Sequence, residues 1–143
     1  FCIIVAGKYN MNVLAIGSKI TIKRICNEII DKVETINLVD YTNNNFLNWD
    51  SLHSNKIQFY SGDIQKIETL IKSNLDNTDI VIVHARNDIE SLFIAQKSKI
   101  NTNMSVFVIL EDLSVAEIFE SIGFIILDSH NLKITKINNK LGN

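Results

Sequence analysis

The chain lacks several features that would point to particular classes of protein. It has 143 residues, with no proline, five glycines and two cysteines. Cys2 and Cys26 lie far apart in the sequence, with no CxxC pair or histidine cluster beside them, which argues against a redox or metal site. We attribute the absence of proline, together with abundant asparagine, isoleucine and lysine, to an AT-rich genome rather than to function.

The charge and hydropathy of the chain argue against two further kinds of partner. A formal net charge of -2 and a pI of about 5.9 give no basis for binding nucleic acid. No apolar run approaches the roughly 20 residues that cross a bilayer, so we expect no direct membrane insertion of this segment. The hydrophobic content of 46% is enough for one well-buried core, which indicates a single domain.

The most informative part of the sequence is a strand–turn–helix–strand unit. Asn12–Ile16 is an apolar run of strand length closed by Gly17, and apolar residues at three- and four-residue steps across 22–33 predict an amphipathic helix. A second strand-like run, Thr35–Val39, ends at Asp40. In dinucleotide-binding folds, the acid that binds ribose follows the glycine turn by about 20 residues, and Asp40 occupies that place.

The turn of this unit has lost most of its glycines. The dinucleotide fingerprint uses glycine so that backbone N–H groups can approach a pyrophosphate at the helix N-terminus. The stretch from Gly17 to Ile22 keeps the first glycine but has Lys19 and Ile22 at the next two positions. Side chains there crowd the phosphate path and hold the helix away from the strand. The pattern therefore predicts the strand–turn–helix–strand architecture of a dinucleotide-binding fold but weakens the case that a dinucleotide binds there.

Four more strand-length apolar runs follow, at 56–60, 80–83, 106–110 and 124–127. Helical patterns lie between them, with predicted starts at Asp63 as an N-cap and at Asn87, where Glu90 completes a reciprocal cap. Ser114 and Glu117 fit a capping box for a last helix with three inward-facing residues: Ile118, Phe119 and Ile122.

Strands that alternate with helices at this spacing predict an α/β fold, a Rossmann-like doubly wound parallel sheet in a single domain. The expected strand order is 3-2-1-4-5-6, which puts the first strand of the unit at the centre. We expect the Rossmann domain to cover residues 11–130. A strand or linker over 1–10 precedes it, and a C-terminal extension over 131–143 follows it.

Three segments resemble the TrkA-N, or RCK, family, whose members regulate K+ conductance. They are Gly62-Asp63 after a strand, the apolar strand Asp79–Val83, and the helix start Asn87–Leu92. The stretch Ala116–Gly123, followed by an apolar strand, is similar to the family's last helix and strand. The resemblance runs from about Met11 to about Ser129.

The resemblance implies a non-catalytic, cytoplasmic regulatory domain at the cytosolic face of the membrane. Such a domain gates a K+ channel or K+ transporter, with a membrane subunit as its partner, through nucleotide-sensitive assembly. It further implies a homodimer or ring, formed through the helix after Ser114 and the residues beyond Leu127. A scaffold domain that gates transport without a nucleotide is the alternative of the same kind.

Carried over by position, the resemblance places a nucleotide site in the cleft above the sheet. Its residues are the phosphate turn Gly17, Ser18 and Lys19; the ribose acid Asp40; Gly62 and Asp63 on the adenine side; and the fourth strand's exit at His84, Ala85 and Arg86. Either Lys19 and Arg86 supply charge for phosphates, or the cleft has decayed. With two glycines lost, we expect weak binding, of ATP or ADP rather than NAD(H).

Several residues of this set also have simpler interpretations. Asp63 fits a helix cap, and His84, on an otherwise apolar strand, fits a hydrogen-bonded core histidine. Glu111 and Asp112 follow the fifth strand without companion ligands, so no metal site is predicted.

Two other functions were weighed against the regulatory interpretation. A phosphoacceptor receiver domain needs an acidic pair after the first strand, an aspartate at the end of the third and a lysine after the fifth; of these, only Asp63 matches. A small NAD-dependent oxidoreductase needs a substrate domain and a positioned acid or base. The sequence shows no Ser/His/Asp or Cys/His constellation, so we predict no enzyme.

Overall fold

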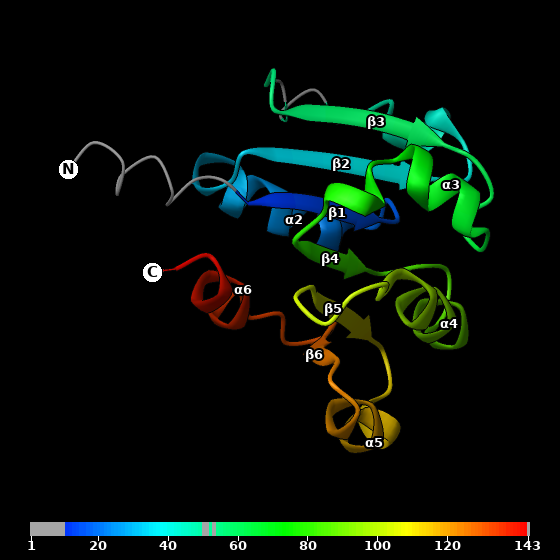
Figure 1. The fold of residues 1–143 in the computed structure, drawn as a ribbon, viewed down its shortest axis with the longest axis vertical. Coiled ribbons are helices and arrows are strands. Elements are labelled where there is room, and N and C mark those ends of the chain that lie inside the picture. Colours follow the sequence, from blue (N-terminus) through cyan, green and yellow to red (C-terminus); the bar gives the residue numbers. More distant parts are fainter. Residues whose placement is uncertain (1–10, 50–51, 53, 143) are drawn as a thin grey trace.

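Six parallel strands form one sheet in the computed structural model, which describes residues 11–49, 52 and 54–142. The order is β3-β2-β1-β4-β5-β6, so the predicted order is confirmed and β1 lies at the centre (Figure 1). The strands are β1 (Asn12–Ile16), β2 (Thr35–Asp40), β3 (Ile57–Ser61), β4 (Ile80–Val83), β5 (Ser105–Leu110) and β6 (Ile125–Asp128). The strand or linker expected over 1–10 lies outside the described residues.

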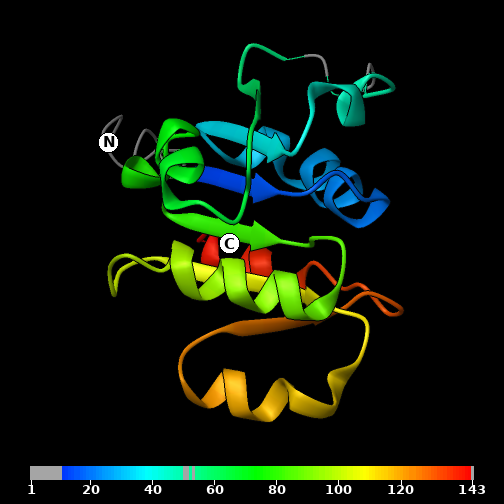
Figure 2. The same ribbon diagram turned by 90° about the vertical axis from the view of Figure 1, so that its right-hand side faces the viewer.

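Helices cover both faces of the sheet, as Figures 1 and 2 show. They are α2 (Ile20–Ile29), α3 (Ile67–Lys72), α4 (Asp88–Ser98), α5 (Ala116–Ser121) and α6 (Thr135–Lys140). The core residues of α2 and α6 belong to one buried cluster, and those of α3 and α4 to the other. The partly buried Ala116 and Phe119 of α5 pack against this second cluster. Within the described ranges, no helix is long and apolar enough to span a bilayer.

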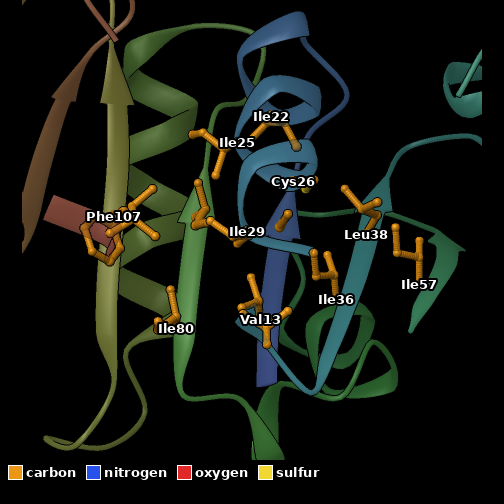
Figure 3. Close-up of a cluster of buried hydrophobic side chains, with 14 of the residues drawn as sticks. Val13, Ile22, Ile25, Cys26, Ile29, Ile36, Leu38, Ile57, Ile80 and Phe107 are labelled. Carbon is orange, nitrogen blue, oxygen red and sulfur yellow. The ribbon is translucent and has the colours of Figure 1, made fainter. Parts of the chain in front are cut away.

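The first of these clusters packs α2 against the strands (Figure 3). Its helical members recur at the three- and four-residue steps that predicted the helix, and Ile22, Ile25, Cys26 and Ile29 are fully buried. Ile22, which stands where the dinucleotide fingerprint has its third glycine, is therefore a core residue. Burial raises the pKa of Cys26 to about 12, so this thiol is an inert apolar filler.

Two predicted helix starts differ from the structure. α3 begins at Ile67 with Lys66 as its N-cap, so the prediction of Asp63 as the helix cap was wrong. Asp63 instead accepts a hydrogen bond from the backbone N–H of Gln65 at 3.0 Å, closing a local turn. The C-terminal extension also contains α6, which was not predicted and which buries Ile137 in the core.

The cap at the start of α4 is half confirmed. Asn87 accepts from the Glu90 N–H at 2.9 Å, as predicted. The returning bond from the Glu90 carboxylate reaches the N–H of Arg86 at 3.1 Å rather than that of Asn87. The Glu90 carboxylate thus binds the backbone of the residue before the N-cap, and that residue, Arg86, lines the cleft described below.

The prediction for the last helix before β6 was partly wrong. Residues Leu113–Val115 form a 3-10 turn capped by Asp112, which accepts from the Ser114 N–H at 2.9 Å, and α5 follows from Ala116. Ile118 and Ile122 are 64% and 57% exposed, so they face solvent rather than the core. The fold leaves an apolar stripe on this helix with no cover from the described chain.

Candidate functional site: a cleft at the carboxyl ends of β1, β2 and β4

A cavity of about 210 Å³ opens at the carboxyl ends of β1, β2 and β4. The sheet changes its winding direction here, because β1 pairs with β2 on one side and β4 on the other, and ligands of open α/β sheets bind at such points. All of the predicted site residues line it except Gly62 and Asp63. The lining consists of Gly17, Ser18, Lys19, Asp40, Tyr41, Asn45, His84, Ala85 and Arg86.

The floor of the cleft is a close contact between two backbone segments. Gly17 has a φ of +115°, and its N–H donates to the Val39 carbonyl at 2.9 Å. A Cβ at Gly17 would lie 2.1 Å from the carbonyl oxygen of His84, so only glycine fits. This is the one fingerprint glycine that the sequence retains.

The turn after Gly17 presents the N-terminus of α2 to the cleft. Lys19 is the N-cap residue in an extended conformation, and its side chain makes no capping hydrogen bond. Its ammonium group instead donates to the Arg86 carbonyl at 3.3 Å, across the cavity. The leading N–H groups of α2 have no side-chain cap, and such groups at a helix N-terminus attract anions.

Asp40 is held in place by three donors from three directions. Its carboxylate accepts from the Ser18 hydroxyl at 2.5 Å, the Asn45 amide at 2.9 Å and the Tyr41 N–H at 2.8 Å. The residue is only 7% exposed. A carboxylate offers about four acceptor positions, so three bonds leave room for one further donor such as a ribose hydroxyl. Asn45, which sequence reasoning missed, is part of this arrangement.

A buried glutamate takes up the charge of Arg86. The Arg86 guanidinium approaches Glu90 to 2.5 Å and lies over the Tyr41 ring, 4.4 Å from its centroid. The Tyr41 hydroxyl and the Gln65 amide donate to the same carboxylate at 2.6 and 2.7 Å. Burial alone would raise the pKa of Glu90, but these hydrogen bonds outweigh it and lower the pKa to about 2. The charge of Arg86 is therefore neutralised by Glu90, while Lys19 makes no ion pair with any described residue.

His84 forms a hydrogen-bonded chain beneath the cleft. Its Nε2 lies 2.9 Å from the Glu111 carboxylate, which fixes the proton there, so Nδ1 accepts from the Thr21 hydroxyl. Burial lowers the pKa of His84 despite Glu111, which keeps the ring neutral at physiological pH. Thr21 is 7% exposed, so this hydroxyl–imidazole–carboxylate chain offers no accessible nucleophile. It ties α2 to the ends of β4 and β5, and His84 is the hydrogen-bonded core histidine of the simpler interpretation.

The TrkA-N domain model matches residues 13–129 of the sequence. This chain belongs to the TrkA-N family. The match covers most of the described TrkA-N domain, from β1 through the end of β6.

Solved structures share the fold of this TrkA-N domain. The TrkA-N domain of the inner membrane protein ybaL from Escherichia coli is 13% identical with a TM-score of 0.68, and 92% of this chain aligns with 96% of that one. The NAD(P)-binding domain of an exopolyphosphatase-related protein from Archaeoglobus fulgidus is 15% identical with a TM-score of 0.66, over 90% and 96% of the two chains. Identities this low establish a common fold alone.

The structure of a channel is also similar. The GsuK channel bound to NAD is 8% identical with a TM-score of 0.65, covering 82% of this chain but only 21% of that chain. The GsuK RCK domain structure aligns with 25% of its own length, so the TrkA-N domain spans a quarter or less of either chain. No curated protein sequence matches the chain.

Sequence reasoning missed the partners that complete the TrkA-N cleft. Glu90 was interpreted only as a cap residue, although it stands four residues after Arg86, the spacing of a helical ion pair. Tyr41 follows Asp40 directly, and that adjacency was the available signal for it. No three His, Cys, Asp or Glu side chains of the described chain are arranged to hold a metal ion.

The Glu90 network predicts a pH-dependent contribution to stability. The folded pKa of Glu90 is depressed from 4.5 to about 2, so its stabilisation is present above pH 4.5 and is lost as the pH falls towards 2. We expect Glu90→Gln to lower the free energy of unfolding by about 1–3 kcal/mol at neutral pH. The difference from the wild type should shrink below pH 4.5 in urea titrations.

Glu117→Gln is the matched control, because Glu117 is exposed on α5. It should leave the unfolding free energy within about 0.5 kcal/mol of the wild type. A Glu90→Gln deficit that stays constant down to pH 2 would show that the charge of Glu90 contributes nothing.

Proposed function

We propose that this TrkA-N domain is a cytosolic regulatory domain that gates a K+ channel or K+ transporter and senses a nucleotide in the cleft. The observation that carries the proposal is the pairing of a pre-positioned acid, Asp40, with the uncapped N-terminus of α2 across one cavity. The acid suits a ribose and the helix end suits phosphates. The NAD bound to the GsuK channel, a fold neighbour, supports the same class of ligand.

The shape and charge of the cleft favour ATP or ADP over NAD(H). The cavity of about 210 Å³ is smaller than the roughly 300 Å³ at which pockets for drug-sized ligands begin. Arg86 is already paired with Glu90, so Lys19 is the side-chain cation left for phosphates. Gly62, whose N–H donates to the Asp40 carbonyl at 3.0 Å, and the following Asp63 adjoin the ribose acid on the proposed adenine side.

The domain regulates rather than catalyses in this proposal. The acidic and basic groups at the cleft are each engaged in several hydrogen bonds: Asp40 by three donors, Glu90 by Arg86 and Tyr41, and His84 by Glu111. Groups held in this way bind and position a ligand but are poorly placed to exchange protons with it. The membrane subunit of the transport system is the proposed partner.

Titration calorimetry tests the ligand assignment. We expect weak, saturable binding of ADP and ATP, with weaker heats for NAD+ and NADH. Asp40→Ala should weaken ADP binding by about tenfold, because a ribose hydroxyl loses its acceptor. Asp31→Ala, which removes an exposed carboxylate from the turn after α2, should leave the affinity unchanged.

The outcomes of this titration separate the two regulatory interpretations. If none of the four ligands gives heat at millimolar concentration, the nucleotide proposal fails. The domain would then be a scaffold that gates transport without a nucleotide. Tight NADH binding that survives Asp40→Ala would show that the site is misplaced.

We further propose that the domain forms a homodimer through α5 and the residues after β6. The exposed apolar stripe on this segment comprises Leu113, Val115, Ile118 and Ile122. Beside it, a mostly apolar cavity of about 490 Å³ is lined by residues of α5, β6 and the loop to α6. An exposed apolar stripe next to a cavity suits a two-fold interface, because the stripe of each copy can pack into the cavity of the other.

Sedimentation velocity tests this assembly. The wild type should sediment as a dimer at micromolar concentration, and Ile118→Asp should shift it to monomer, since a buried interface cannot accept an unpaired carboxylate. Ile89→Asp places the same charge on α4, where the side chain is 83% exposed, and should leave the dimer intact. A wild-type chain that is monomeric at micromolar concentration would contradict the proposal.

A further inference from the structure

We propose a second ligand site at the opposite end of the strands, which binds a neutral polyhydroxyl compound such as a sugar or polyol. It is a cavity of about 390 Å³ at the amino ends of β1, β2 and β3. The nucleotide cleft lies at the carboxyl ends of the strands, so the two sites are separated by the length of the sheet.

Carboxamides dominate the lining of this cavity. Six of them face it: Asn12, Asn37, Asn55, Gln58, Asn74 and Asn77. Thr35 and Tyr60 add hydroxyl groups, and Lys56 is the charged residue of the lining. The Lys56 ammonium donates to the Ile30 carbonyl at 3.1 Å, so its charge is already engaged by the protein.

Asn37 shows that the cavity is built for a polar occupant. It lies in the middle of β2, an internal strand, in register between Leu14 of β1 and Gln58 of β3. Asn37 is only 5% exposed, yet its side chain makes no hydrogen bond to any described residue. Its neighbours on the same face, Leu14 and Val39, are apolar core residues. The amide borders the cavity and is not sealed in the core, since Asn37 is absent from the fully buried side-chain polar atoms that lack a partner, among which the described residues show Ser129 Oγ. A ligand in the cavity would supply hydrogen-bond partners to the Asn37 amide in place of water.

The chain after α3 packs Leu75 into the core and also forms a wall of the cavity. α3 spans only Ile67–Lys72, and Asn74 then adopts a left-handed conformation with φ +79°. This turn leads into the 3-10 segment Leu75–Asn77, which brings Asn74 and Asn77 to the cavity. Figure 1 shows α3 beside the carboxyl ends of β2 and β3, away from the amino ends where the cavity lies.

Hydrogen bonds among the lining side chains fix their orientation. Thr35 donates to Asn12 Oδ1 at 2.7 Å, Asn77 Nδ2 donates to Asn74 Oδ1 at 3.0 Å, and Tyr60 donates to Gln58 Oε1 at 2.9 Å.

These bonds leave both kinds of hydrogen-bonding group for a ligand. Gln58 Nε2 remains as a donor, Asn77 Oδ1 as an acceptor, and both ends of Asn37 are available. Hydroxyl groups both donate and accept, whereas a carboxylate only accepts and an ammonium only donates. The lining therefore matches a neutral polyol better than an ion.

NMR of the side-chain amides tests the site directly. Glucose, maltose and myo-inositol serve as neutral probes, with glucuronate and glucosamine as charged counterparts. We expect saturable shifts of the Asn37 side-chain NH2 resonances with at least one neutral probe, and weaker effects from the charged ones. Asn37→Leu, followed through the Gln58 side-chain NH2 resonances, should abolish the binding, and Gln58→Ala, followed through those of Asn37, should weaken it by about tenfold. Asn131→Ala, on the loop after β6, should leave it unchanged.

Stability measurements distinguish a ligand site from a structural role of Asn37. Asn37→Leu replaces an amide without partners by an apolar side chain among apolar neighbours, so the free protein should keep or raise its melting temperature. If Asn37→Leu fails to fold, the Gln58→Ala variant tests the site instead. Gln58 is exposed, so its replacement should change ligand binding without changing the fold. The proposal is overturned if no neutral probe shifts the Asn37 resonances at high millimolar concentration, if binding survives Gln58→Ala unchanged, or if glucuronate binds more tightly than glucose.

Discussion

The close approach of Gly17 to the backbone of His84 is the constraint on which the cleft depends. A side chain at Gly17 would collide with the His84 carbonyl, so the turn after β1 lies directly against the end of β4. That contact sets the position of Lys19 at the start of α2 and of the Thr21–His84–Glu111 chain below it. The loss of the other two fingerprint glycines leaves this contact intact, because Ile22 is absorbed by the core. The domain thus keeps an open cavity above this contact although side chains occupy the other two glycine positions.

Electrostatics then decide what the cleft can hold. The sequence offers two cations at its mouth, but Glu90 neutralises Arg86, and only Lys19 is left facing the cavity without an ion pair among the described residues. The low pKa of Glu90 keeps this pairing intact throughout the physiological range. On the other side, Asp40 is fixed by donors from the turn and from the chain after β2. One acid in place and one available cation are the features on which the proposed weak binding of a small nucleotide rests.

The sequence predicts the sheet well because the central strands β1, β4 and β5 are short apolar runs, and the order follows from the rules of doubly wound folds. Helix ends were harder, since the chain closes a turn at Asp63 and a 3-10 segment at Ser114 before each helix begins. The exposure of Ile118 could not be predicted, because an apolar helix stripe looks the same whether the core or a partner covers it. The Tyr41–Glu90 bond joins residues far apart in the sequence, which no local spacing reveals.

The most direct test of the central claim is a crystal structure of the chain soaked with ADP. The account predicts phosphates at the N-terminus of α2 beside Lys19, a ribose hydroxyl on the free acceptor position of Asp40, and Arg86 still paired with Glu90. An empty cleft at saturating ADP, or a nucleotide bound away from Asp40, would contradict it.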